Sequence, residues 1–599
     1  MTDLQFRVRQ HMTRSHVLHL RIGQNVFSED AKQAMHRVGS PMRWLPETQE
    51  WDCPCSPAAV EAIQAAAESL GATVDWAEGL REYAQAHLAQ AATEGATRIA
   101  LERIIRENLP VDPYVTNSTD PRGNSAPPLR HQAIGYHWSQ RCGGVLFGWD
   151  PGTGKTRGAA DAAGGWYRHR LIEPMRPMYE ETTGQPRVYG GVLVVCPRTM
   201  LRTWERELRH WQNASSVIVG GSAQKKLRAA ATPADFHIVN YESLKYVAAN
   251  LYHGLIIDEC HRAANSTQQT DYILSIATRT RRRIGLSGTP MANNLQSLFY
   301  PLLAIDGGRS LGASKTAFLE NYFIERAGYN GARDYDAKAD ALPRISAAVA
   351  RSVHWVKKEE VLDLPKKTFT PQYLPMTPEQ HAYYMKVKRE AIAYIQDATV
   401  TLEQAQARAM KLIQICQGFV LPDEGTGRHF TNAKTDALMD LLDDTLRGRK
   451  TIVWAYFNYE IEVLTKQLKE RQINFVRIDG TVTSQRERDR AVDRWNGDDY
   501  LQVFVRQYSM SEGVTLLGTK ANPCFNCVYM GLSYRYIDWL QSQDRIHRIG
   551  QDYPVNYNVL LTEGGIDSQI YDKVMEKTDL AFGLREESKD FYLSLLTAA

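Results

Sequence analysis

Short apolar runs of strand length recur along the chain and are followed by polar turns or by helix-like stretches. The clearest runs occupy residues 144–148, 191–196, 255–257 and 450–457. Each of them predicts a buried strand, and the alanine-rich stretch after the first run predicts a helix. A chain of 599 residues is too long for a single core, so about three or four domains are expected. The pattern therefore predicts an α/β protein of several domains.

The first 109 residues have a different pattern, typical of a small α+β accessory module. A predicted hairpin carries Arg43, Trp44 and Trp51, and an alanine-rich helical stretch runs from about residue 76 to about residue 108. The two tryptophans have two interpretations. They are core aromatics of the module, or they form a nucleic-acid surface with Arg43, because indoles stack on bases and arginines hold phosphates.

A glycine-rich turn between the first apolar run and its helix has the pattern of a phosphate-binding loop. Its glycines let backbone N–H groups approach phosphate oxygens, Lys155 supplies a positive charge, and Thr156 offers a hydroxyl to Mg²⁺. The first glycine of the general pattern G-x-x-x-x-G-K-[ST] is replaced by Trp149. A structural glycine turn is the alternative. The residues expected to bind nucleotide here are Gly152, Thr153, Gly154, Lys155 and Thr156.

Two adjacent carboxylates strengthen the nucleotide hypothesis. Asp258 and Glu259 end an apolar run, where a parallel strand would deliver them to the carboxyl edge of a sheet. Asp258 is expected to hold Mg²⁺, and Glu259 to orient and deprotonate the attacking water. Upstream of the loop, Gln132 has the paired donor and acceptor needed to recognise an adenine edge. Together these residues predict an enzyme that uses ATP and Mg²⁺.

Composition sets limits on the remaining function classes. The 71 basic and 68 acidic residues nearly balance, so a nucleic-acid surface must be a local groove. No window is apolar enough for a membrane span and the N-terminus is too polar for a signal peptide, so we expect a soluble, intracellular protein. Two close cysteine pairs, Cys53 with Cys55 and Cys524 with Cys527, are each half of a zinc site or, as we favour, free thiols.

Taken in order, further motifs resemble the SWI/SNF-type DNA translocases, a branch of the superfamily 2 helicase-like ATPases. The resemblance covers about residues 127–583, and its most specific segment is 541–551. It implies two RecA-like lobes with helical insertions that close over ATP and move along duplex DNA. The motif segments that carry it, after the phosphate loop, span residues 192–208, 238–244, 258–265, 286–295, 474–488, 503–516 and 541–551.

The resemblance also implies roles for individual residues. Arg545 and Arg548 are three positions apart on an expected helix, where they share a face and act as arginine fingers when the lobes close. Nucleotide contacts in the second lobe are implied for Gly513 and Gln541. The implied DNA-contacting residues are Arg198, Thr199, Asn240, Tyr241, Asp479, Gly480 and Thr515.

The expected domain order follows from the motifs and from the composition between them. The module at 1–109 is joined by a linker, rich in Pro, Asn, Asp, Ser and Gly, to the first RecA-like lobe. The further segments are the linker 110–128, lobe one 129–305, an insertion and inter-lobe region 306–375, a helical protrusion 376–420, lobe two 421–583 and a tail 584–599.

The expected function is a DNA-dependent ATPase that translocates on double-stranded or branched DNA as a monomer, in repair, recombination or transcription. A polymerase or repair factor is an expected protein partner, and no membrane is. Three alternatives stay open: a fork-remodelling or annealing helicase, whose accessory domain the tryptophan hairpin resembles, an RNA-dependent helicase, and a nucleic-acid or polymerase-binding factor without hydrolysis. The lack of long charged tails and of nuclear-type basic clusters favours a bacterial or phage enzyme in the cytoplasm over a nuclear one.

Overall fold

The computed structural model describes most of the chain, in two compact units. The first unit holds Met1–Asp150, Gly154–Met291 and Leu295–Lys357, and the second holds Pro151–Thr153, Ala292–Asn294 and Lys358–Ala599. The residues described are 5–12, 18–24, 43–45, 47–54, 57–107, 109–111, 126–180, 184–288, 295–327, 333–396, 402–421, 428–482, 484–508, 514–532 and 536–576.

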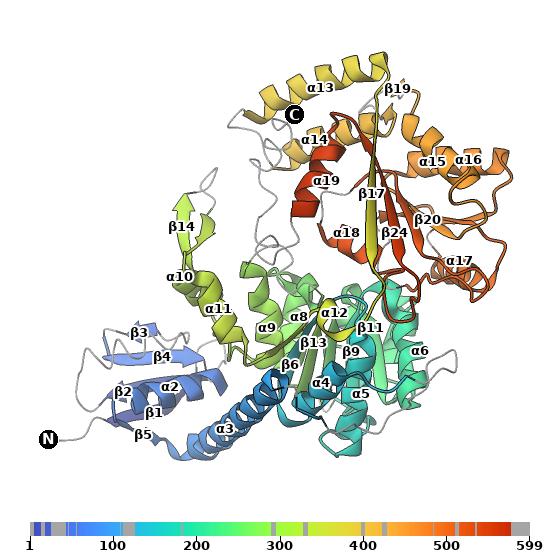
Figure 1. The fold of residues 1–599 in the computed structure, drawn as a ribbon. Coiled ribbons are helices and arrows are strands. Elements are labelled where there is room, and N and C mark those ends of the chain that lie inside the picture. The colour runs from blue at the N-terminus through green and yellow to red at the C-terminus, as the bar shows by residue number, and fades with distance from the viewer. Residues whose placement is uncertain are drawn as a thin grey trace. The chain divides into compact units, whose positions relative to one another are not determined.

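The N-terminal module is an α+β fold (Figure 1, blue). Its five strands lie in the order β3-β4-β2-β1-β5, and the expected tryptophan hairpin is formed by the antiparallel pair β3 and β4. One long helix, α3 (Glu78–Arg106), corresponds to the expected helical stretch. The other elements are β1 (Gln5–Met12), β2 (Leu18–Gln24), β3 (Arg43–Leu45), β4 (Glu50–Pro54), α2 (Pro57–Ser69) and β5 (Thr73–Trp76).

The first lobe is built on a seven-stranded sheet in the order β10-β11-β9-β12-β13-β6-β16. Every pairing in this sheet is parallel, so all strands end at one edge. Its strands are β6 (Gly144–Trp149), β9 (Val192–Cys196), β10 (Ser216–Ile218), β11 (Phe236–Asn240), β12 (Gly254–Asp258), β13 (Arg282–Leu286) and β16 (Val353–Val356). The helices are α4 (Arg130–Arg141), α5 (Lys155–Arg168), α6 (Leu201–Gln212), α7 (Ala223–Ala230), α8 (Gln268–Ala277) and α9 (Phe299–Asp306).

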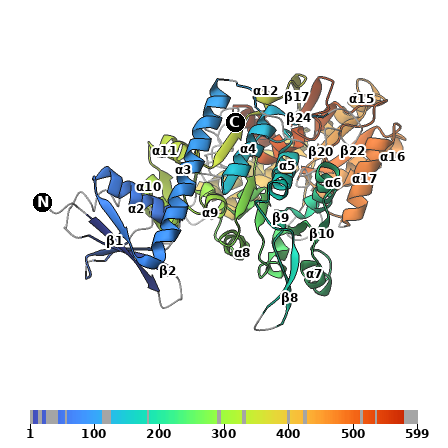
Figure 2. The same cartoon turned by 90° about the horizontal axis from the view of Figure 1, so that it is seen from below.

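Short elements decorate this lobe. Four 3₁₀ helices, η1 (Arg198–Met200), η2 (Tyr241–Tyr246), η3 (Cys260–Ala263) and η4 (Leu295–Leu298), lie within its described ranges, beside a hairpin of β7 (Arg176–Tyr179) and β8 (Pro186–Tyr189) that is visible in Figure 2. The predicted insertion contains α10 (Lys315–Tyr322), a hairpin of β14 (Phe323–Ala327) and β15 (Arg333–Ala337), and α11 (Ala341–Val349). The same predicted region also supplies β16, the edge strand of this sheet.

The second unit holds a parallel six-stranded sheet in the order β17-β24-β23-β20-β22-β21. Its strands are β17 (Lys367–Leu374), β20 (Thr451–Ala455), β21 (Phe475–Ile478), β22 (Val503–Gln507), β23 (Asn526–Tyr529) and β24 (Val555–Thr562). Its helices are α12 (Lys358–Val361), α13 (Pro378–Gln396), α14 (Leu402–Cys416), α15 (Ala433–Asp443), α16 (Asn458–Glu470), α17 (Gln485–Gly497), α18 (Tyr536–Gln543) and α19 (Ile566–Glu576), with a small hairpin of β18 (Phe419–Val420) and β19 (Arg428–His429).

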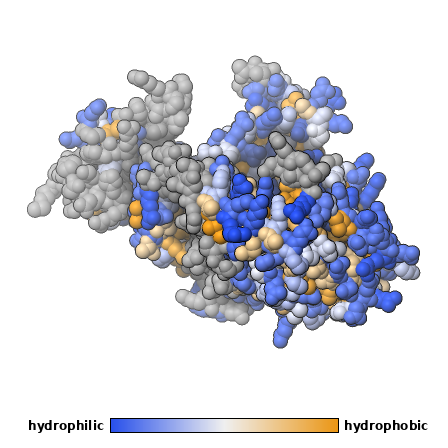
Figure 3. Space-filling model, turned by 90° about the horizontal axis from the view of Figure 1, so that it is seen from above, coloured by the Kyte–Doolittle hydropathy of each residue, from blue (hydrophilic) through white to orange (hydrophobic). Residues whose placement is uncertain are grey.

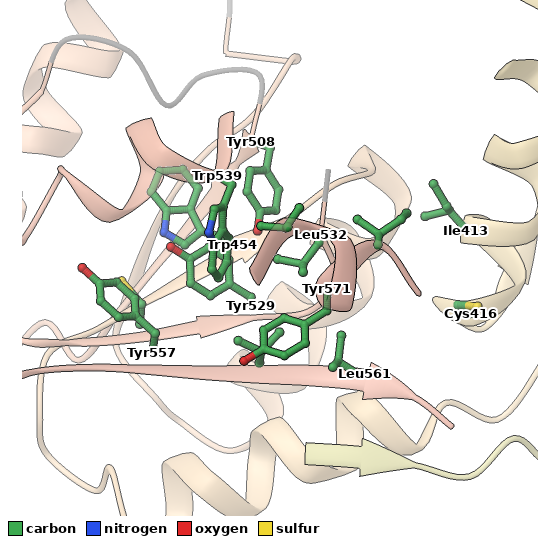
Figure 4. Close-up of a cluster of buried hydrophobic side chains, with 14 of the residues drawn as sticks. Ile413, Cys416, Trp454, Tyr508, Tyr529, Leu532, Trp539, Tyr557, Leu561 and Tyr571 are labelled. Carbon is green, nitrogen blue, oxygen red and sulfur yellow. The ribbon is translucent and has the colours of Figure 1, made fainter. Parts of the chain in front are cut away.

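A large aromatic core holds this second unit together. Trp454, Tyr529 and Tyr557 lie on neighbouring strands and are fully buried, and α14 and α19 add aliphatic side chains (Figure 4). Cys524 and Cys527 are buried free thiols in the same core. Burying one large side chain stabilises a fold by about 1.5–3 kcal/mol, so this cluster anchors the strands that carry the second set of predicted site residues.

The surface shows small apolar groups among hydrophilic residues on the face drawn in Figure 3. Within the described ranges, none of the helices combines the length and apolarity needed to cross a bilayer.

Candidate functional site

The predicted phosphate loop follows β6 directly. Gly152 and Gly154 have φ angles of 85° and 86°, a left-handed conformation that glycine adopts without a Cβ clash. Helix α5 begins at Lys155, so its N-terminal N–H groups point toward the loop. The Lys155 Nζ atom donates a hydrogen bond of 2.8 Å to the Trp149 carbonyl oxygen. The backbone therefore has the conformation that a phosphate cradle requires.

Gln132 lies beside this loop, although its amide does not project into an open site. It is only 1% exposed. Its Oε1 atom accepts a hydrogen bond from Leu129 N at 2.9 Å, and its Nε2 atom donates to Gly154 O at 3.2 Å. Each amide atom makes one hydrogen bond to the protein, so Gln132 supports the loop in this structure, and its contact with adenine stays a prediction.

The acidic pair lies at the carboxyl end of β12, as predicted. Asp258 is buried, and its Oδ2 atom accepts a hydrogen bond of 2.9 Å from the indole Nε1 of Trp204 on α6. Burial and the charge of Glu259 raise the pKa of Asp258 above its ordinary value, and the Trp204 N–H opposes that shift. A second bond, 3.0 Å from Glu259 N, fixes Oδ1.

Glu259 has a strained backbone. Its φ of 51° is in the left-handed region, which costs a non-glycine residue roughly 1–3 kcal/mol. This turn places its Oε2 atom 3.3 Å from His261 Nδ1, which lies 3.2 Å from the Ser287 hydroxyl at the end of β13. The glutamate is therefore linked to the next strand of the sheet.

The sheet register brings the loop and the acidic pair to one edge. Asp258 pairs with Leu286, and Leu286 pairs with Phe147, two residues before Trp149. Two adjacent carboxylates, one of them buried, ionise together most readily beside a cation. Carboxylate and hydroxyl oxygens are the donors that Mg²⁺ prefers. The side chains present, those of Thr156 and Asp258, therefore fit the expected metal.

The predicted DNA-contacting residues of the first lobe lie at the ends of β9 and β11. Arg198 is exposed and Thr199 is half-buried, both on η1, so these two stay candidates. Asn240 is 9% exposed, and its amide donates to the Glu242 carboxylate. Tyr241 is buried, and its hydroxyl donates to Asp258 O at 2.7 Å. The Tyr241 side chain therefore supports the acidic turn and does not offer a DNA contact, which corrects the prediction for it.

The two motif arginines of the second unit lie beyond the helix expected to carry them. Helix α18 ends at Gln543, and residues 544–550 form successive turns. Arg545 is 7% exposed. Its Nε atom donates a hydrogen bond of 2.7 Å to Gln541 O, and its Nη1 atom donates one of 3.2 Å to Val514 O. Arg548 is half-buried. The prediction that the two arginines share a helix face is therefore wrong, because turn bonds from Arg545 N to Ser542 O and from Ile546 N to Gln543 O follow the end of α18.

The other predicted residues of the second unit have mixed settings. Asp479 is 2% exposed, and its carboxylate accepts from Thr481 N at 2.8 Å, so it shapes a turn and is no surface contact. Gly480 is exposed, and Thr515 is half-buried with its carbonyl bound to Asn496 Nδ2 at 2.9 Å. Gly513 lies outside the described residues.

The tryptophan hairpin has one buried member. Trp51 is 1% exposed and packs in the core of the module, so it is a core aromatic and not part of a stacking surface. Nothing is described of the side chains of Arg43 and Trp44.

Several functional contacts had no sequence signal. The bond from Trp204 to Asp258 joins residues 54 apart, and the supporting role of Tyr241 depends on β11 and β12 lying on either side of β9 in the same sheet. The acceptor of a hydroxyl or indole N–H group cannot be predicted from the sequence until the order of the strands in the sheet is known.

Comparison with protein families and with known proteins completes this description. Residues 42–418 match the model of the SNF2-related domain, and residues 433–550 match the helicase conserved C-terminal domain. The chain is 24% identical to Nuclear protein STH1/NPS1 of Saccharomyces cerevisiae over 428 residues, which is 65% of this chain and 31% of that protein. It is 24% identical to Chromodomain-helicase-DNA-binding protein 1-like of Danio rerio over 520 residues, 81% and 47% of the two chains.

Among solved structures, the Sulfolobus solfataricus SWI2/SNF2 ATPase core in complex with dsDNA matches with 19% identity and a TM-score of 0.34, covering 78% of this chain and 96% of that one. The chain spans between about a third and about half of the length of the curated relatives named above.

The same comparison overturns the expectation of a cytoplasmic bacterial or phage enzyme. The relatives that match include proteins of yeasts, fish and human, and the Saccharomyces cerevisiae protein STH1/NPS1 is named a nuclear protein. The absence of long charged tails and basic clusters was therefore a poor guide to the source of the chain.

Proposed function

The chain belongs to the SNF2-related family of helicase-like ATPases, and from this premise we propose that it is a DNA-dependent ATPase that translocates on duplex DNA in the nucleus. The observation that carries the proposal is the position of the phosphate loop and the acidic pair at one edge of one parallel sheet, while two arginines stand at the corresponding motif of a second, separately folded sheet.

In this proposal, residues at the carboxyl edge of the first sheet bind and activate the substrate. The loop glycines and Lys155 hold the triphosphate, and Thr156 and Asp258 would hold Mg²⁺, which supplies charge neutralisation at the phosphates when it is bound. Glu259 accepts a proton from the attacking water, and its link to His261 keeps the carboxylate oriented. The buried Trp204 fixes the Asp258 carboxylate in one orientation.

The residues of the second unit complete the reaction. Arg545 and Arg548 stabilise the negative charge that develops on the transferred phosphoryl group. Because they belong to a different unit from Lys155 and Glu259, hydrolysis depends on how the two units are arranged. Duplex DNA bound to both units can then gate hydrolysis, and contacts to phosphates suit a motor because they carry no sequence information.

The test is ATP turnover with duplex DNA in three variants. Glu259→Gln should bind ATP but lose turnover by about a hundredfold or more, since the proton acceptor is gone. Arg545→Ala should keep ATP binding and lose about a thousandfold in rate. Arg471→Ala is the matched control, because this half-exposed arginine pairs only with Asp443 among its described ion pairs. Near wild-type turnover in Glu259→Gln or Arg545→Ala would refute the site assignment.

A further inference from the structure

Trp149 occupies the position where the general phosphate-loop pattern has its first glycine. Its indole is fully buried, and two glycines make room for it. A Cβ atom at Gly135 on α4 or at Gly158 on α5 would lie 2.7 Å from the indole ring, closer than real Cβ contacts allow. The Trp149 ring therefore packs against glycine positions on both α4 and α5.

The indole ring makes three aromatic contacts, one of them with the His354 ring at 5.6 Å, and one hydrogen bond. It stacks on Phe147 with ring centroids 4.3 Å apart, and the His131 ring meets it edge-on at 4.8 Å. Its Nε1 atom donates a hydrogen bond of 3.1 Å to Nδ1 of His354. Burial, aided by the charges of His131 and Arg130, lowers the pKa of His354 to about 3, so its ring is neutral at physiological pH and Nδ1 can accept.

His354 lies on β16, the strand after which the first unit ends at Lys357. Backbone bonds join β16 to the loop strand β6, among them Asp150 N to Val356 O at 3.0 Å and Leu146 N to Ser352 O at 2.7 Å. The bond from Trp149 to His354 is a side-chain link across the same two strands. Trp149 thus contacts the strand by which the chain leaves this unit.

The other end of Trp149 contacts the nucleotide lysine. Its carbonyl oxygen accepts the hydrogen bond from Lys155 Nζ. A bound triphosphate attracts the same ammonium group, so nucleotide binding competes with this bond and changes the setting of the Trp149 backbone. Trp149 therefore contacts both Lys155, the lysine proposed to bind phosphate, and β16, the strand at the end of the first unit.

We propose that Trp149 and His354 are a positioning pair that transmits nucleotide occupancy of the phosphate loop to β16. This inference rests on the proposed nucleotide site. It adds that nucleotide binding at that site affects β16, the last strand of the first unit. The indole and the imidazole do not touch substrate. They act by holding β6 and β16 together as the loop changes.

The test is amide hydrogen exchange of the full chain, with and without the non-hydrolysable analogue AMP-PNP and Mg²⁺. In the wild type, the analogue should slow exchange in peptides covering both the loop and residues 353–356. Trp149→Phe and His354→Leu should reduce the β16 response by about threefold to tenfold, the size of effect expected from one ordinary hydrogen bond. His354→Asn should keep it, since its side-chain oxygen can accept in place of Nδ1.

Trp138→Phe is the matched control. Trp138 is a buried tryptophan whose ring lies 5.6 Å from that of His354, and its indole N–H has no hydrogen-bond partner among the residues that the structure describes. This variant should retain the β16 response. A full wild-type response in both Trp149→Phe and His354→Leu would overturn the inference, and so would an equal loss in Trp138→Phe or in His354→Asn.

The two proposals fail in different ways. Absence of any protection at the wild-type loop would count against the proposed nucleotide site and, with it, against the inference. Protection at the loop without a response in β16 would count against the inference alone.

Discussion

At the scale of single residues, the site depends on side chains that hold the reacting groups. Asp258 is oriented by the Trp204 indole, and the turn after it is held by the Tyr241 hydroxyl. Groups that orient a metal ligand commonly change metal affinity by about tenfold or more when they are removed. Such supporting residues offer cleaner tests than the reacting groups, because their loss leaves the chemistry in place.

Trp204→Phe should raise the Mg²⁺ concentration that gives half-maximal ATP turnover by roughly tenfold, with the maximal rate largely recovered at high Mg²⁺. The ring stays in the core while the N–H that fixes Asp258 Oδ2 is lost. A Mg²⁺ titration of turnover measures the effect. The control is Trp211→Phe on the same helix, whose indole donates to Glu207. Equal Mg²⁺ requirements in the two variants would contradict this role of Trp204.

The buried histidine of β16 gives a pH-dependent prediction. His354 has an ordinary pKa of 6.5 in the unfolded chain and about 3 in the fold, so below pH 6.5 only the unfolded chain takes up this proton. In the wild type, this residue should therefore lower the free energy of unfolding as pH falls below 6.5, by up to about 1.4 kcal/mol per pH unit. His354→Leu should remove that part of the slope, measured by denaturant unfolding from pH 7 to 5. Trp138→Phe should keep it, and an unchanged slope in His354→Leu would contradict the assignment.

At the scale of elements, an ionic cluster holds the N-terminal module on the first lobe. Arg309, in the loop after α9, contacts Glu61 of α2 at 3.0 Å and Glu94 of α3 at 2.6 Å. Glu94 also accepts a bond of 2.8 Å from Gly143 N, just before β6. The Arg309 side chain is 11% exposed, so this contact is screened little by solvent. Two helices of the module are therefore fixed by one guanidinium.

Arg309→Ala should destabilise the first unit by about 3–5 kcal/mol, because it leaves two carboxylates facing each other without their cation. The measurement is the thermal unfolding midpoint. Arg9→Ala is the control, since Arg9 is 62% exposed in its pair with Glu50 and an exposed pair contributes about 1 kcal/mol or less. Equal midpoints for the two variants would show that the cluster does not hold the module in place.

Elements with a strong local pattern were predictable from the sequence, and their ends were not. The helix expected over residues 76–108, observed as α3, and the hairpin of Trp44 and Trp51 follow from apolar spacing. The end of α18 at Gln543 does not, because short-range turn bonds follow it and the Arg545 side chain bonds to the Val514 carbonyl oxygen, 31 residues away in the sequence. The Gln132 amide shows the same limit, because its hydrogen bond to the Gly154 carbonyl oxygen in the loop could not be predicted from the helix pattern.

At the scale of the whole molecule, motif order was enough to predict the family and the α/β fold, and both predictions are confirmed. Phosphate chemistry restricts residue types at fixed spacing, so Lys155, Asp258 and Glu259 could be proposed as site residues from the sequence alone. The neighbours of these residues could not, because Trp204 and His354 reach the site only through the strand order of the first sheet. The cellular compartment was predicted wrongly, since the catalytic core carries no signal for it.

The most direct test of the central claim is steady-state ATP hydrolysis by the full chain at one salt concentration, because phosphate binding is salt-sensitive. The arms are no nucleic acid, single-stranded DNA, plain duplex DNA, forked DNA and duplex RNA. We predict strong stimulation by plain duplex DNA, absent in the Lys155→Ala variant, which should lose nucleotide binding. Stimulation by RNA alone, or no turnover in any arm, would contradict the account of this chain as a DNA-dependent ATPase.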